Sequence, residues 1–183
     1  MPKVVQRFEP PGLLARIERL ALQPLWTEIE QILGTFNLLI EEKIDGNGGG
    51  AVRKLIDEQF RAAGGWKKGS SGEIDWSKCL TINGARVCLG VEVQVSARSD
   101  LMIVDICHIR DALMEGRIDL GLLVVPSDQF RPFLTDRVGG FKDAKIALDR
   151  ICAQDHPVAI WGIAYDGTGP ALGKSRPQYA RNK

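Results

Sequence analysis

The chain has 183 residues and a formal net charge of +1. This length allows one domain with a sizeable core and leaves too little chain for two. With 44% hydrophobic and 26% charged residues, the composition is that of an ordinary globular protein, so any binding of nucleic acid must come from local basic patches or from the pairing of two copies.

The sequence contains neither a candidate membrane span nor a secretory signal. No run approaches the roughly 18 uncharged apolar residues of a membrane helix, and residues 1–7 lack the apolar core of a signal peptide. The cysteines are scattered without a CxxC pair, which argues against a zinc site. We therefore predict a cytoplasmic protein with no membrane partner, in which these thiols are reduced and mostly buried: Cys79, Cys88, Cys107 and Cys152.

Hydrophobic spacing predicts that the first third of the chain is helical. Residues 13–20 keep a helical period, and a second helix begins at Pro24, a residue that suits the first turn of a helix. A loop over residues 41–50 ends in Gly-Asn-Gly-Gly-Gly and has little reason to be ordered by itself. Residues 51–63 return to a helical pattern.

The second half of the chain alternates between strands and helices. Its first part is a predicted hairpin. A helix is then expected from about residue 100 to residue 115, followed by a strand over residues 118–125 that is almost wholly apolar and therefore buried on both faces. Residues 141–151 are predicted to be helical, and residues 158–165 to form a last strand.

The chain changes composition after Asp166, where Gly, Pro, Lys and Arg become frequent. We predict one domain over residues 1–166 and a basic C-terminal tail over residues 167–183. Two interpretations of the tail remain open: a frayed terminus, or a basic arm that contacts phosphates.

Asn83-Gly84 is the strongest short-range hairpin signal in the sequence. If these two residues form the loop of a type I′ turn, the sequence numbers of any two facing residues add up to 167. Cys79 then faces Cys88, and Asp75 faces Glu92. A bulged turn would shift this register by one residue. One side of the hairpin is an apolar core face, and the other carries its polar residues: Glu73, Asp75, Ser77, Cys79, Thr81, Arg86, Cys88, Gly90, Glu92 and Gln94.

The facing carboxylates of Asp75 and Glu92 are unusual. Like charges about 5 Å apart on a sheet repel each other and weaken it, whereas a divalent cation between them would turn this repulsion into attraction. Mg²⁺, for which Mn²⁺ could substitute, favours one or two carboxylates completed by water and phosphate oxygens, and Gly90 would leave room for a ligand to approach. The alternative is an exposed strand face on which acids merely confer solubility.

Such a site would suit the metal-assisted cleavage of a phosphodiester. Asp75 and Glu92 would hold the ion, and the carbonyl of Val93 would be a further ligand. Gln94 lies on the same side of the strand as Glu92 and could orient the attacking water or bind the phosphate. Glu73 is a weaker candidate.

Ile74-Asp75-Trp76, followed by Val91-Glu92-Val93-Gln94-Val95, resembles the D…ExQ variant of the PD-(D/E)xK nuclease motif. More narrowly, the chain is similar to the BglII/BstYI group of type II restriction endonucleases, in which Gln stands where most relatives have Lys. The similarity covers roughly residues 22–166 and includes four further blocks: residues 24–29, 58–67, 118–126 and 160–163.

This resemblance implies an α/β fold, with a mixed central β-sheet flanked by helices around a restriction-endonuclease-like core. It identifies Asp75 and Glu92 with the metal-binding acids of the group and Gln94 with its lysine substitute. The interval from Asp75 to Glu92 is longer than expected for the group, as if the hairpin were extended. Asn83 could be mistaken for the first acidic position, but the hairpin register places it in the turn.

The resemblance also implies a type II site-specific deoxyribonuclease, a homodimer that recognises short palindromes in double-stranded DNA, often centred on GATC. A restriction role further implies a cognate DNA methyltransferase. Lys67, Lys68 and Arg98 are candidate phosphate contacts. Candidate base-reading residues follow the central strand, although each could equally be an ordinary surface residue: Ser127, Asp128, Gln129, Thr135, Asp136 and Arg137.

Two other functions remain open from the sequence. The first is a DNA repair or recombination nuclease of the same fold that recognises structure instead of sequence. The second is a DNA-binding module without turnover, against which the intact Asp75, Glu92 and Gln94 argue. We interpret His108 as structural or as part of a dimer interface, in preference to a catalytic base.

Overall fold

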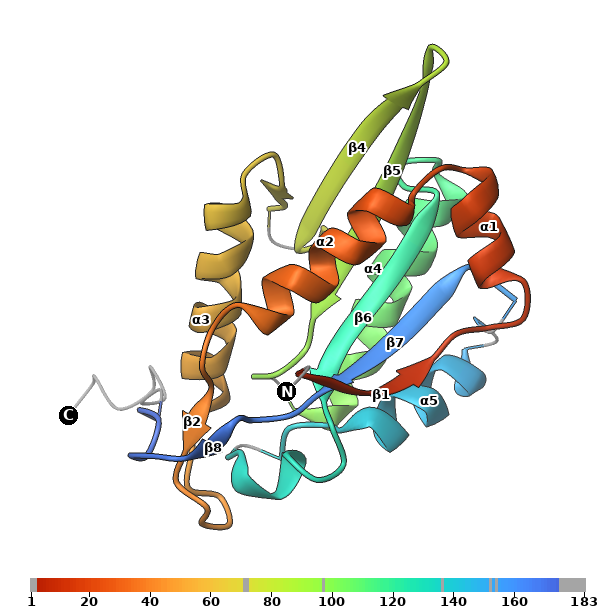
Figure 1. The fold of residues 1–183 in the computed structure, drawn as a ribbon. Coiled ribbons are helices and arrows are strands. Elements are labelled where there is room, and N and C mark those ends of the chain that lie inside the picture. Colours follow the sequence, from red (N-terminus) through yellow and green to blue (C-terminus); the bar gives the residue numbers. More distant parts are fainter. Residues whose placement is uncertain are drawn as a thin grey trace, which may run out of the picture.

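The computed structural model describes residues 3–70, 73–96, 98–135, 137–151, 153 and 155–174. These residues form a mixed α/β unit in which a six-stranded sheet is flanked by helices (Figure 1). The elements are β1 (Val4–Phe8), α1 (Leu13–Arg19), α2 (Gln23–Gly34), β2 (Leu39–Ile40), α3 (Gly49–Ala63), β3 (Lys67–Lys68), β4 (Trp76–Ile82), β5 (Ala85–Val93), the 3₁₀ turn η1 (Ser99–Leu101), α4 (Met102–Met114), β6 (Leu120–Pro126), the 3₁₀ turn η2 (Arg131–Phe133), α5 (Phe141–Arg150), β7 (Val158–Ile163) and β8 (Gly167–Thr168).

The strand order of the large sheet is β1-β7-β6-β5-β4-β3. Strands β5, β6 and β7 are parallel, whereas β4 pairs antiparallel with β5 and β1 antiparallel with β7. Every residue of β6 is buried, as its continuous apolar run predicts for a strand covered on both faces. The predicted mixed sheet flanked by helices is therefore confirmed, and two short strands, β2 and β8, pair separately.

Two apolar clusters cover the two faces of the sheet. Helices α1, α2 and α3 pack on one face, where the ring of Trp26 meets that of Trp161 edge-on. Helices α4 and α5 pack on the other face, and Figure 1 shows them behind the sheet, opposite α2. No helix in the described part of the chain is long and apolar enough to cross a membrane.

The β4–β5 hairpin has the predicted register. Its ladder runs from Ile82–Ala85 to Trp76–Val91, so each pair sums to 167. Asn83 and Gly84 both have positive φ angles, 51° and 81°, as a type I′ turn requires. The tip of the hairpin projects beyond the helices (top of Figure 1).

Strand β1 corrects the prediction that the first third of the chain is helical. It pairs with β7 at one edge of the sheet. Its residues are alternately half-buried and exposed, but one inward position is the polar Gln6, whose amide donates to Asp128 and whose carbonyl oxygen accepts from the Asp128 N–H. The apolar alternation that would have indicated a strand is therefore missing.

The Gly-Asn-Gly-Gly-Gly segment, expected to lack order by itself, is ordered by contacts with distant residues. The side chain of Asn47 is buried, donates to the carbonyl oxygens of Glu41 and Phe133, and accepts from the Leu172 N–H. A Cβ atom at Gly49 would lie 2.2 Å from the carbonyl oxygen of Val95, so only glycine allows this approach. Residues 167–174 of the predicted tail contact this region through β8 and Leu172, and the rest of the tail lies outside the described residues.

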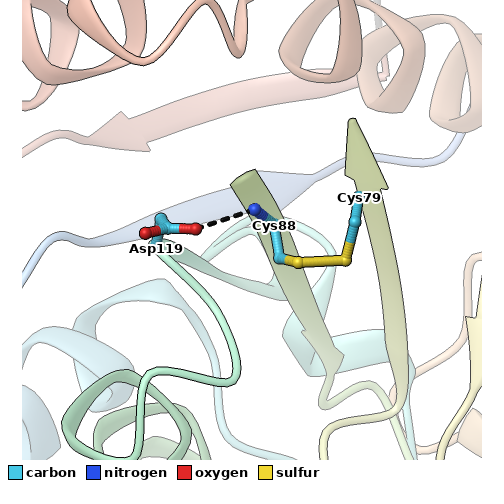
Figure 2. Close-up of a disulfide and its surroundings, with 3 residues drawn as sticks. All are labelled: Cys79, Cys88 and Asp119. Carbon is cyan, nitrogen blue, oxygen red and sulfur yellow. Dashed lines mark hydrogen bonds between the residues drawn. A yellow bond between two sulfur atoms is a disulfide. The ribbon is translucent and has the colours of Figure 1, made fainter. Parts of the chain in front are cut away.

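Cys79 and Cys88 form a disulfide bond across the hairpin (Figure 2). The prediction of reduced thiols is therefore wrong for this pair, although the register correctly places the two residues opposite each other. Asp119 accepts a hydrogen bond from the Cys88 N–H at 2.8 Å. Cys107 is a free cysteine, and Cys152 lies outside the described residues.

We expect reduction of this disulfide to lower the free energy of unfolding by about 2–3 kcal/mol, because it closes a short loop and restricts the unfolded chain. The measurement is urea unfolding with and without dithiothreitol. Cys79→Ser should unfold like the reduced protein and be insensitive to the reductant, whereas Cys107→Ser should keep the sensitivity of the wild type. Equal stability of the oxidised and reduced proteins would contradict this expectation.

Candidate active site

A cleft of ≈ 280 Å³ lies where the C-terminal end of β5 meets α3 and α4. Strand β5 supplies side chains to this cleft from the face of the sheet that packs against α4. The polar side chains that carry the argument below come from four segments of the chain: Arg53, Asp75, Glu92, Gln94, Asp105 and His108.

The structure brings the predicted acid pair together. Glu92 is on β5 and is only 3% exposed. Asp75 comes directly before β4, and one of its carboxylate oxygens accepts a hydrogen bond from the Val93 N–H at 2.9 Å. Asp75 and Glu92 both line the cleft, and, besides burial, the nearness of Asp75 raises the pKa of Glu92. The polar side of the hairpin is thus buried under α4 at this end, where an exposed strand face was the alternative.

Gly90 does not provide the open space that its lack of a side chain suggested. A Cβ atom there would lie 2.8 Å from Cδ1 of Ile74 and 2.9 Å from Cδ1 of Ile118. Ile74 packs in the apolar cluster beneath α4 and α5. Strict alternation along the strand would place it on the opposite face of the sheet. It does not follow this alternation because it precedes the first residue of β4.

Arg53 of α3 is a site residue that the sequence analysis missed. Its guanidinium donates to the carbonyl oxygen of Val93 at 2.7 Å and forms an ion pair with Asp75. It also donates to Asp57 at 3.0 Å. The guanidinium thus binds two of the three groups predicted to hold a metal ion. One arginine on the polar side of an amphipathic helix carries no signal of such a role.

Helix α4 adds Asp105 and His108, which are three residues apart and so share one side of the helix. Nδ1 of His108 lies 3.4 Å from Oε1 of Glu92. One candidate ligand atom from each of Glu92, Asp105 and His108 lies within 4.8 Å of the other two. Asp105 is not predicted from the sequence, and His108 is interpreted there as structural or as part of a dimer interface. Only the packing of α4 on β5 reveals this cluster.

The electrostatics of the cleft are dominated by buried carboxyl groups. Burial, together with the hydrogen bond and charge of Asp75, raises the pKa of Glu92 to about 11. Burial and the charge of Asp75 raise the pKa of Asp105 to about 7. Three carboxyl groups thus meet one guanidinium, that of Arg53. Shifts of this size are frequent at functional sites.

The donor set fits a divalent cation. Oε1 of Glu92 and Oδ2 of Asp105 are buried and have no hydrogen-bond partner among the described residues. A buried carboxylate oxygen without a partner is costly, and a bound cation would remove this cost. Gln94 lines the same cleft, is 4% exposed, and donates its backbone N–H to Val124.

Two of the predicted base-reading residues are buried, and a third is half-buried and hydrogen-bonded within the protein. Ser127 is fully buried, and its hydroxyl oxygen accepts from the Phe130 N–H. Both carboxylate oxygens of Asp128 accept hydrogen bonds, from Gln6 and from the Lys142 N–H. Thr135 is 7% exposed. The side chains of Ser127 and Asp128 therefore support the loop through bonds within the protein.

Gln129 and Arg137 are exposed in the segment that follows β6, and Arg137 adopts a positive φ of 56°. Asp136 lies outside the described residues. The Ser99 N–H donates to the carbonyl oxygen of Arg137, which connects this segment to the chain leaving β5. Because parallel strands end at the same edge of a sheet, Gln129 and Arg137 share the edge at which the cleft lies.

The predicted phosphate contacts lie on the surface, but two of them have internal partners. Lys67 is exposed on β3. Lys68 forms an ion pair with Asp57 on α3, and Arg98 forms one with Asp100. Lys68 and Arg98 would have to exchange these carboxylates for phosphates on binding DNA.

The mixed sheet, with an acid pair at the base of its hairpin, is consistent with the restriction-endonuclease-like class of nuclease folds. A model of the family described as "Restriction endonuclease BglII/BglIII" matches residues 17–164. The chain belongs to this family and is a restriction endonuclease, an enzyme that acts on DNA. A search of curated proteins gave no match.

We expect the metal-free protein to lose stability as the pH rises from 5 to 7. Over this range the folded state keeps protons on Glu92 and Asp105, whose pKa values are raised, while the unfolded chain releases them. The folded state therefore binds more protons, and the free energy of unfolding falls by up to about 1.4 kcal/mol per pH unit for each such carboxyl group. The measurement is urea unfolding in EDTA.

Glu92→Gln is the test variant, because it cannot ionise and should lose its share of this slope. Groups with a lowered pKa, such as Asp57, change their protonation only at lower pH and do not affect the comparison. A wild-type stability that is flat or rises between pH 5 and 7 would refute the assignment.

We expect Arg53→Met to lower the free energy of unfolding by about 2 kcal/mol in EDTA, because Asp75 and the Val93 carbonyl lose a charged donor. The same variant should bind Ca²⁺ more tightly, since both oxygens become available to a cation. Isothermal titration calorimetry measures the second effect. Lys54→Met, at the neighbouring exposed position on α3, is the matched control and should change neither quantity. Weaker Ca²⁺ binding by Arg53→Met would argue against competition between the guanidinium and the ion.

Proposed function

We propose that this restriction endonuclease is a type II site-specific deoxyribonuclease, which hydrolyses double-stranded DNA at a short palindromic site in the presence of Mg²⁺, with Mn²⁺ as a substitute. The observation that carries the metal dependence is the buried Glu92 carboxylate, which has an oxygen without a hydrogen-bond partner and lies beside Asp75. Hydrolysis of a phosphodiester requires stabilisation of negative charge in such a cleft.

In this proposal Asp75, Glu92 and the carbonyl oxygen of Val93 hold the cation. When bound, the ion lowers the pKa of a water molecule and offsets negative charge on the scissile phosphate. Asp75 is positioned by the Val93 N–H, so its carboxylate is tied to the strand that carries Glu92. Arg53 has to release the Val93 carbonyl for this ligand set to be complete.

Gln94 would act on water or phosphate by hydrogen bonding. Its amide can both donate and accept, and its position two residues after Glu92 places it in the same cleft. An amide has no proton to transfer at neutral pH. Gln94 would therefore orient a reactant without serving as a general base.

The palindromic site, which we propose to be GATC-centred, would be read by a homodimer, because two-fold symmetric protein matches two-fold symmetric DNA. Arg137 would donate two guanidinium N–H groups to O6 and N7 of a guanine, and Gln129 would form two hydrogen bonds with an adenine, the base contacts that suit these side chains. Both are exposed on the segment held by the internal bonds of Ser127 and Asp128. A cognate DNA methyltransferase would protect the host sequence.

We expect the purified protein to cut plasmid DNA into discrete fragments with Mg²⁺, and Asp75→Asn or Glu92→Gln to abolish cutting while DNA binding persists. Both changes remove a carboxylate from the cleft, whereas Asp155→Asn makes the same substitution at an exposed position away from it. The measurements are gel electrophoresis of the digest, sequencing of the cut ends, and binding of a labelled duplex.

The fragment pattern separates the candidate activities. Discrete fragments with one recurring end sequence support site-specific cleavage. A smear, or cutting only at junctions and lesions, would refute it in favour of a structure-specific nuclease. Binding without cleavage under any divalent ion would identify a DNA-binding module, and cleavage that survives both acid substitutions would refute the site.

A further inference from the structure

We propose that Glu92, Asp105 and His108 form a second divalent-cation position, on the α4 side of the acid pair, which selects a transition-metal dication such as Mn²⁺ over Mg²⁺. This inference deepens the proposed function and rests on it for the use that the enzyme makes of the ion. The site itself is argued from the side chains alone.

The geometry of the three side chains suits one cation. Asp105 and His108 are one helical turn apart on α4, a spacing that also places carboxylate and imidazole ligands together in helical metal proteins. Glu92 faces them from β5, with Oε1 at 3.4 Å from Nδ1 of His108. The three candidate ligand atoms lie within 4.8 Å of one another.

A second observation points to a ligand. Glu92 is 97% buried, since its exposed fraction is 3%, and its Oε1 has no hydrogen-bond partner although it faces the imidazole. Oδ2 of Asp105 is also buried without a partner in the described part of the chain. Two neighbouring buried oxygens therefore lack a hydrogen-bond donor. A cation bound between them would offset the cost of burying them.

This position shares Glu92 with the first one, which also uses Asp75 and the Val93 carbonyl, and differs from it in its other ligands. At the first position, the guanidinium of Arg53 already binds both of these groups. Among the described residues no arginine forms an ion pair with Glu92 or Asp105, although the charge of Arg53 acts on both. A cation can therefore bind beside α4 while Arg53 stays in place. Two carboxylates that would otherwise repel Asp75 are then partly neutralised.

The imidazole determines the class of ion. Mg²⁺ strongly prefers oxygen ligands and keeps most of its water, whereas first-row transition-metal dications accept an imidazole nitrogen and bind N/O sites more tightly along the series from Mn²⁺ to Ni²⁺. A site with one nitrogen and two carboxylates should therefore discriminate in favour of Mn²⁺. Removal of the imidazole should abolish this preference.

The experiment measures binding of the metal alone, without DNA, to the full chain. Isothermal titration calorimetry gives the Kd for Mn²⁺ and for Mg²⁺. We expect His108→Ala to weaken Mn²⁺ binding at least about tenfold, with a much smaller effect on Mg²⁺. The chain has two histidines, so His156→Ala is the matched control and should leave both constants unchanged.

Proton NMR of the two imidazoles locates the ion. Small amounts of Mn²⁺ should broaden the His108 signals and spare those of His156, and the His156→Ala protein assigns them. If His108→Ala fails to fold, Asp105→Asn serves as the second variant, and it should weaken Mn²⁺ binding and reduce the broadening of His108.

Three outcomes would overturn the inference: unchanged Mn²⁺ affinity in His108→Ala, equal broadening of both histidines, or no Mn²⁺ binding below millimolar concentrations. The result for the proposed function is separate. Normal Mg²⁺-dependent cleavage with His108 untouched by Mn²⁺ would refute the second position alone. Mn²⁺ bound at His108 without any cleavage of DNA would refute the proposed function alone.

Discussion

The buried carboxyl group of Glu92 is the constraint around which the other elements of the cleft are arranged. Glu92 lies on a central strand beneath a helix and close to Asp75 and Asp105. Three acidic groups are therefore close together in a site with little access to water. Such an arrangement opposes folding unless the charge is neutralised by protons or cations. Arg53 supplies one fixed cation. Burial raises the pKa of Glu92 and that of Asp105, so we expect the metal-free protein to retain protons on these two groups.

The rest of the fold offsets this local cost. Two apolar clusters cover the two faces of the sheet, and β6 is buried along its whole length. The acids therefore occupy one end of a well-packed sheet, in which backbone positions are set by the strand ladder. The Val93 N–H, which donates to the Asp75 carboxylate, is fixed by this ladder. It therefore holds the carboxylate in place without any rearrangement of the backbone.

The same edge of the sheet connects the cleft to the segment that carries Gln129 and Arg137. Parallel strands β5 and β6 end side by side, and the Ser99 N–H bonds to the Arg137 carbonyl oxygen. The same segment is also held at Phe133, whose carbonyl oxygen accepts a hydrogen bond from the side chain of Asn47. A base-reading segment held by both contacts would be rigid relative to the acids, as cleavage at a fixed distance from the recognised bases requires.

The amino-acid sequence by itself determined the elements whose signals are local. The Asn83-Gly84 turn set the register of the ladder from Ile82–Ala85 to Trp76–Val91, because a two-residue loop leaves one way to align the strands. Asp75 and Glu92 lie directly beyond the last pair of this ladder, so the register also brought them to the same end of the hairpin. Tertiary structure alone decided which groups surround that pair. Arg53, Asp105 and His108 come from helices whose spacing along the chain does not encode how they pack on the sheet. For Cys79 and Cys88 the sequence predicted the facing positions, and the structure decided that the two thiols form a disulfide bond.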